Sequence, residues 1–216
     1  MRVLIVAKTK MRNNTCIGAL DLKEGESLRL LDEEGKNWPL NVDFDVGDVW
    51  EIKIKRPEKV TPPHIEDVIV TKKEFLYKCS NAKETIQKLI TPWKGGVEAL
   101  FNGLLKFTTN RSAYISLREP LPDRSTWFWI PDKDLEMKET LEEYSGDDMW
   151  MIVRKMRKIR YYYPSIPPFR VAFVGFQTPI KIIPKGTLIR VSLSRPSSKN
   201  EFLKDKCFLQ ISGWFL

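Results

Sequence analysis

The chain has 216 residues, of which 42% are hydrophobic, and its formal net charge is +8 at pH 7. This composition supports one large or two small domains with a buried core, and it excludes a chain that is disordered throughout. No apolar run approaches the roughly 18–20 residues of a membrane span, and the N-terminal apolar run is too short for a signal peptide. We therefore expect a cytoplasmic protein.

Up to about residue 80 the sequence has the pattern of short strands. Segments rich in β-branched and apolar residues occur at 2–8, 15–22, 26–32 and 49–55, and an extended pattern resumes over 64–78. Trp50 has apolar neighbours at period two, which places it in the core. Short strands interrupted by glycine bends predict a small barrel or sandwich rather than a βαβ sheet.

The middle of the chain has a helical pattern. Residues 80–90 predict one helix, with Ser80 or Asn81 as its N-cap. Residues 96–107 predict a second, because Val97 and the leucines and phenylalanine that follow recur at helical spacing. The Gly95–Gly96 pair separates the two.

Beyond residue 108 the strand pattern returns and continues to the C-terminus. The expected strands are 111–117, 126–130, 158–163, 169–176, 187–195 and 207–215. Trp214, in the last of them, is expected in or near the core. The acidic run 132–148 is expected to be a solvated helix or loop.

The order of strands, helices and strands predicts a mainly β protein with two small barrel-like units. We expect an N-terminal barrel at 1–80, a helical connector at 81–107 and a basic C-terminal barrel at 108–216.

Few residues suggest catalytic or metal chemistry. The three cysteines, Cys16, Cys79 and Cys207, form no CxxC pair, which indicates reduced thiols rather than a zinc site or a disulfide framework. No P-loop, dinucleotide-binding or nucleophile-elbow motif occurs. We therefore expect no metal site, no cofactor and no enzymatic activity.

The single histidine, His64, lies in the segment PPHIED beside Glu66 and Asp67. One histidine with two carboxylates could serve as a general base, and a divergent nuclease built on these three residues is one alternative. A loop anchor is the structural interpretation, which we favour.

Both ends of the chain contain distinctive sequence segments. They are MRVLIVAKTKMRNNTCIGALDL with DVGDVWEIKIKRPEKVTPPHIEDVIV at the start, and GTLIRVSLSRP with CFLQISGWF at the end. These segments resemble sequences of the prokaryotic dual OB-containing domain family. The resemblance implies two OB folds, five-stranded Greek-key barrels that commonly bind oligonucleotides or oligosaccharides. It brings no catalytic residues to this chain.

Basic charge is concentrated in the C-terminal third. Residues 151–216 carry 13 basic and 2 acidic side chains, whereas residues 1–150 carry 23 basic and 26 acidic ones. Such asymmetry favours a polyanionic partner. We expect a nucleic-acid-binding face made by the charges Lys158, Arg160, Arg190 and Arg195, with Tyr162 as a stacking ring. Two other interpretations remain: a generic basic surface with core tyrosines, and a segment that balances the acidic run inside the fold.

The sequence therefore favours a non-enzymatic nucleic-acid-binding protein, with single-stranded DNA or RNA preferred as ligand. It would act alone or within a larger assembly such as a bacterial defence system. The alternative is a protein-interaction adaptor whose basic face meets an acidic partner. The sequence leaves the choice of nucleic acid and the oligomeric state open.

Overall fold

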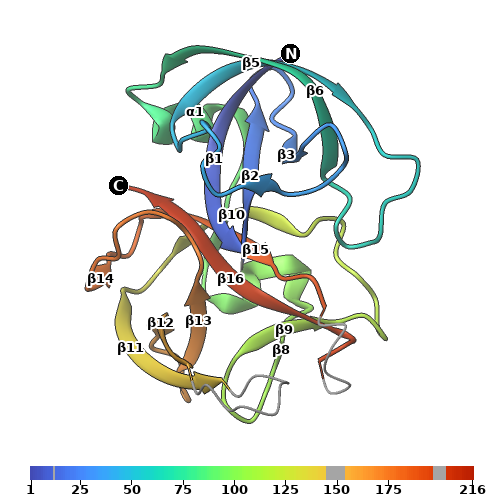
Figure 1. Ribbon diagram of the computed structural model, residues 1–216. Coiled ribbons are helices and arrows are strands. Elements are labelled where there is room, and N and C mark those ends of the chain that lie inside the picture. Colours follow the sequence, from blue (N-terminus) through green and yellow to red (C-terminus); the bar gives the residue numbers. More distant parts are fainter. Residues whose placement is uncertain (12, 145–153, 197–202) are drawn as a thin grey trace.

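The computed structural model contains two β units, one above the other in Figure 1, with the N-terminal unit in blue to teal and the C-terminal unit in green to red. The structure describes residues 1–11, 13–144, 154–196 and 203–216. The fold is mainly β, as the sequence predicts.

The elements follow in chain order. The first half contains β1 (Arg2–Met11), β2 (Asn14–Asp21), β3 (Ser27–Leu31), β4 (Trp38–Pro39), β5 (Asp48–Lys55), β6 (Asp67–Lys78), the helix α1 (Ala82–Leu89), β7 (Trp93–Gly95) and the 3₁₀ segment η1 (Val97–Gly103). The second half contains β8 (Lys106–Phe107), β9 (Ala113–Ser116), β10 (Thr126–Pro131), β11 (Leu135–Tyr144), β12 (Arg154–Tyr163), β13 (Phe169–Phe173), β14 (Ile182–Ile183), β15 (Leu188–Leu193) and β16 (Lys206–Phe215).

Five strands of the first unit close into a barrel. Their order around the ring is β1, β2, β3, β6, β5 and back to β1, with β3 and β6 parallel and the other pairs antiparallel. This is the Greek-key order of an OB barrel. Alternate residues fill its interior, so Ile17 and Ala19 of β2 point inward while Cys16 and Gly18 point outward. Trp50 is buried in this core, as predicted.

The second unit repeats the same strand order. Strands β11, β12 and β13 form an antiparallel meander, β13 pairs in parallel with β16, and β16 pairs with β15. Strand β15 then pairs with β10, which leads directly along the chain into β11. The ring of strands in the second unit is thus closed by the chain segment that connects β10 to β11. Trp214 is buried in this second core, which confirms its prediction.

A third apolar cluster holds the two units together. Leu4, Val6 and Leu20 of the first barrel meet Phe128, Leu188 and Phe215 of the second, and α1 adds Ile86. Strand β15 is consequently buried on both faces. Its residues Ile189, Val191 and Leu193 face the second core, and Leu188 faces the first barrel.

Two expected elements take a different form. The prediction of a second helix at 96–107 is wrong, because η1 contains extended Leu100 and left-handed Phe101 and Asn102. Leu100 and Phe101 are both fully buried. Neighbouring residues on a regular helix point about 100° apart, so the irregular backbone lets both side chains reach the second core.

The expectation of a solvated helix or loop for the acidic run is also wrong where the structure describes it. Residues 135–144 form the strand β11, paired with β12 and β14. Leu135 is buried and Met137 packs on the core, while Glu136 and Lys138 are exposed. This alternation is the period of a half-buried strand. Residues 145–148 lie outside the described part of the chain.

Within the segment expected as a helical connector, α1 is helical and β7 pairs in parallel with β10 of the second sheet. The domain boundaries at 80 and 107 stay a prediction.

Candidate nucleic-acid interface

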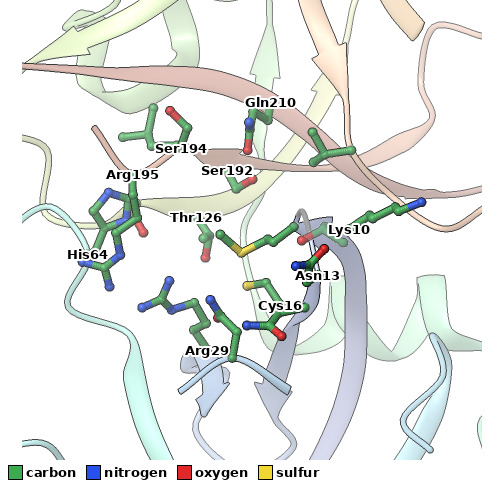
Figure 2. A pocket seen from close by; sticks show the side chains of 17 residues that line it. Lys10, Asn13, Cys16, Arg29, His64, Thr126, Ser192, Ser194, Arg195 and Gln210 are labelled. Carbon is green, nitrogen blue, oxygen red and sulfur yellow. The ribbon is translucent and has the colours of Figure 1, made fainter. Parts of the chain in front are cut away.

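A cleft of about 610 Å³ opens between the two barrels. Figure 2 shows it from close by. One wall comes from the first barrel, and the other comes from β15 and β16 of the second. The first wall contributes Lys10, Asn13, Asn14, Cys16, Arg29 and His64, and the second contributes Ser192, Ser194, Arg195 and Gln210. This volume lies within the ~300–1,000 Å³ of ordinary ligand sites.

The first wall includes the surface that OB folds use for ligands. That surface is the outer face of the second and third strands, with the loops after the first and fourth strands. Here Cys16 and Arg29 lie on the outer faces of β2 and β3, Asn13 lies at the β1–β2 turn, and His64 lies in the loop between β5 and β6. The second barrel covers the inner part of this surface and leaves the part near the loops open as the cleft.

The charge of the cleft is positive. Lys10, Arg29 and Arg195 line it, and none of the described lining residues carries a carboxylate. Asp67, just behind the wall, accepts from Arg29 Nε at 2.5 Å and Nη2 at 2.6 Å, and from Arg195 Nη2 at 2.7 Å. One carboxylate therefore faces two guanidinium groups, which leaves an excess of positive charge. Burial lowers the pKa of Arg195, and Arg29 lowers it further.

His64 forms a neutral part of the wall. Its ring is buried, and Nε2 lies 3.8 Å from Cys207 Sγ. Burial, followed by the charges of Arg195 and Arg29, lowers the pKa of His64 to about 4. Burial also raises the pKa of Cys207 to about 11, so this thiol stays protonated at neutral pH. The pair is packed into the structure as uncharged groups, which agrees with the anchor interpretation of PPHIED.

The depressed pKa of His64 predicts a loss of stability in acid. The unfolded chain binds a proton on this ring below pH ~6.5, whereas the folded chain binds it only near pH 4. Protonation therefore favours unfolding as the pH falls through this window. We expect His64 to remove about 2–3 kcal/mol of unfolding free energy between pH 7 and pH 4.5. Urea unfolding at both pH values checks this.

The variant His64→Gln isolates that contribution, because the carboxylates of the protein titrate equally in both chains. The drop in unfolding free energy from pH 7 to pH 4.5 should be smaller in the variant by most of that amount. An equal drop in the two proteins would show that the ring is accessible to protons in the folded state.

Glu66 joins the barrels beside the cleft. Its carboxylate accepts from the backbone N of Ser125 at 2.5 Å, from Ser125 Oγ at 2.7 Å and from the backbone N of Thr126 at 3.1 Å. Glu66 lies just before β6, and Ser125 and Thr126 lie at the start of β10. Both Glu66 and Ser125 are buried. The acidic residues of PPHIED are thus held in structural contacts, Glu66 across the interface and Asp67 between two arginines.

The five predicted site residues do not share one face. Arg195 lines the cleft. Arg190 is only 2% exposed and lies between the barrels, so the expectation that it lies on an open strand face is wrong. The physical reason is that both faces of β15 are covered, one by the second core and the other by the first barrel.

The other three predicted residues, Lys158, Arg160 and Tyr162, lie on the outer face of β12, which points away from the core. Arg160 is nevertheless buried. Tyr162 is partly exposed, with Lys138 Nζ 4.8 Å from its ring centre. Lys158 and Arg160 both have interaction partners. Tyr161 and Tyr163 are core residues, as one of the alternative interpretations has it.

The basic strand β12 lies directly against the acidic strand β11. Among the cross-strand neighbours, Glu136 lies opposite Tyr162, Lys138 opposite Arg160 and Glu139 opposite Ile159. None of these three pairs joins opposite charges, so the idea that the basic segment balances the acidic run stays a prediction. The burial of Arg160 and the positive lining of the cleft move the candidate interface to the cleft. Residues 145–153 and 197–202, which include parts of both charge runs, lie outside the described residues.

Sequence reasoning missed Lys10, Arg29, Asn13 and Gln210. The available signal was the OB pattern itself, because it marks the outer residues of β2 and β3 and two loops as the ligand face. The contribution of Gln210 from the opposite wall depends on how the two barrels dock, and the strand pattern does not specify that arrangement.

Comparison with known families agrees with this architecture. A family model described as "Dual OB-containing domain" matches residues 1–214. The chain belongs to the dual OB-containing domain family. No curated protein matches the chain.

Other functional features are limited within the described part of this dual OB protein. No group of three or more His, Cys, Asp or Glu residues there is arranged to hold a metal ion. No helix there is long and apolar enough to cross a bilayer.

Proposed function

We propose that this dual OB protein binds single-stranded nucleic acid in the cleft between its barrels, without catalysing a reaction on it. The observation that carries the proposal is the coincidence of the OB ligand face with the positive wall made by Lys10, Arg29 and Arg195. Cationic side chains at such a face would neutralise phosphates and release their counterions.

The neutral groups of the cleft favour a single strand over a duplex. Asn13, Ser192 and Gln210 offer amide and hydroxyl groups from both walls. Such groups can bond to the edges of unpaired bases, which a duplex holds in its stack. A duplex would present mainly its backbone, and the facing wall of the cleft would limit its approach.

The polar groups beside the cleft favour binding without chemistry. The nuclease alternative requires His64, Glu66 and Asp67 to be available for substrate. Instead, Glu66 is bonded to Ser125 and Thr126, and Asp67 is paired with two arginines.

Fluorescence anisotropy on the full chain tests the proposal. Labelled single-stranded DNA, single-stranded RNA and duplex DNA of one sequence would be titrated at 50 and 200 mM salt. We expect micromolar or tighter binding of a single strand, weaker binding of the duplex, and a slope of log K against log[salt] of about −2 to −3, as for three phosphate contacts. No binding of any of the three at low salt would refute the proposal and favour an acidic protein partner.

A further inference from the structure

Arg190 is a buried cation with no acidic partner in the part of the chain that the structure describes. Its Nη1 and Nη2 lie 3.3 and 3.2 Å from Ser27 Oγ, and Nη2 lies 3.1 Å from Thr126 Oγ1. Among the described residues, no carboxylate lies within ion-pair distance, and Nε has no hydrogen-bond acceptor. The guanidinium lies over the Phe128 ring, 5.4 Å from its centre.

This arrangement is costly for a group with a purely structural role. A buried charge is strongly disfavoured unless it is paired and hydrogen-bonded, and the two hydroxyl groups accept from three of the five guanidinium N–H donors of Arg190, which leaves Nε among those without an acceptor. Burial lowers the pKa of Arg190 to about 10, so it remains charged at neutral pH. Glu66 helps to keep it charged from a distance. An anion that entered from the cleft would supply the missing partner.

The structure provides a route for such an anion. A second cavity of about 40 Å³ lies at the inner end of the cleft and is lined by Arg190. It shares Thr9, Cys16, Arg29, Thr126 and Ser192 with the cleft. This volume exceeds the ~10–15 Å³ that one water-sized group needs.

The passage that leads from the cleft through this small cavity to Arg190 is closed at its inner end. Leu20 and Leu188, each two residues from a lining residue, belong to the apolar cluster between the barrels, as do Val6 and Phe128. Gly18 completes the floor, because a Cβ at this position would lie 2.9 Å from Arg190 Nη2. A group that reaches Arg190 therefore has no exit on the far side.

We infer that the cleft captures the phosphorylated end of a nucleic-acid strand, with the terminal phosphate directed toward Arg190 and flanked by Arg29 and Arg195. This inference rests on the proposed function. An internal phosphate joins nucleotides on both sides, so it cannot enter a passage that is closed at its inner end. A terminal phosphate has one attachment, and near pH 7 its charge is between about −1.5 and −2. It suits a blind site with several cations better than a diester does.

Competition binding on the full chain tests the inference. Four unlabelled competitors would be compared: one strand with a 5′-phosphate, the same strand with a 3′-phosphate, the same strand with hydroxyl groups at both ends, and free adenosine monophosphate. We expect one of the phosphorylated strands to bind about tenfold more tightly than the hydroxyl-ended strand, as for one added charge-assisted contact. The mononucleotide should compete much more weakly than that strand.

Three variants assign the preference to the passage. Arg190→Met should bring the affinity ratio of phosphorylated to hydroxyl-ended strand close to one, and Arg195→Gln should reduce it. The control Arg118→Gln removes an exposed ion pair with Asp205 that is not part of the cleft, and should leave the ratio unchanged. If Arg190→Met does not fold, Arg195→Gln alone decides the assignment.

Each other outcome overturns the inference in a recognisable way. Equal binding of the three strands would exclude capture of a phosphorylated end while nucleic-acid binding stands. Competition by adenosine monophosphate as strong as that of the best strand would identify a free nucleotide as the ligand. Failure of all three strands to bind would refute the proposed function as well. A ratio that survives both Arg190→Met and Arg195→Gln would place the end-binding site elsewhere.

Discussion

Replacing Glu66 with alanine should lower the free energy of unfolding by about 3–5 kcal/mol, the range for removing one partner from a buried charged network. The carboxylate accepts from two backbone NH groups and one hydroxyl of the opposite barrel. Its loss would leave those donors buried without an acceptor, and it would remove the carboxylate whose charge helps to keep Arg190 protonated. Equilibrium unfolding in urea measures the change.

A conservative variant and a control variant show whether the loss of stability comes from the buried hydrogen bonds of Glu66. Glu66→Gln keeps one acceptor oxygen and should cost less, about 1–3 kcal/mol. Glu119→Ala is the control, because it breaks an exposed ion pair with Lys106 and should cost at most about 1 kcal/mol. If Glu66→Ala lies within 1 kcal/mol of the parent protein, the bonds to Ser125 and Thr126 do not hold the barrels together.

Reversing the charge of Lys10 should weaken binding of a single strand about tenfold to thirtyfold. Lys10 is exposed at the mouth of the cleft, so its substitution leaves the buried contacts intact. In the proposed complex the change would remove one phosphate contact and would place a carboxylate beside the path of the strand. The salt slope should also become flatter by about one unit. Anisotropy titrations of Lys10→Glu at two salt concentrations measure both effects.

The control for this variant is Lys88→Glu on α1, which carries the same charge change at an exposed position that does not line the cleft. It should change affinity only through the net charge, by about threefold or less at 150 mM salt, where exposed charges more than ~8 Å apart are largely screened. Equal losses in the two variants would show that binding follows overall charge and has no site at the cleft.

Much of the fold was predictable because core-facing residues alternate with outward-facing residues along the strands. Trp50 and Trp214 follow that rule, and both are buried. The rule was also present in β11, where Leu135 and Met137 alternate with charged residues. The density of carboxylates there obscured it. The apolar residues of η1 had helical spacing, but burying both Leu100 and Phe101 required a backbone that is not helical.

The site was harder to predict because it belongs to the interface between the barrels. A single strand pattern tells which residues of β15 share a face, but not that a second barrel covers the polar face and buries Arg190. The same limit applies to the cleft, where Arg29 and Gln210 come from different barrels. The charge asymmetry of the sequence was real, yet two of the four basic residues expected at the interface, Arg160 and Arg190, are buried.

The most direct test of the cleft as binding site is photocross-linking of a single strand that carries 4-thiouridine or 5-iodouracil, with the attachment points identified by mass spectrometry. If the strand lies between the barrels, adducts should map to the β1–β2 turn, the loop around His64 and the wall formed by Ser192 to Arg195. Lys10→Glu should reduce their yield, and Lys88→Glu should not. Adducts concentrated instead at Tyr162 and its neighbours on β12, with none on either wall of the cleft, would contradict this account.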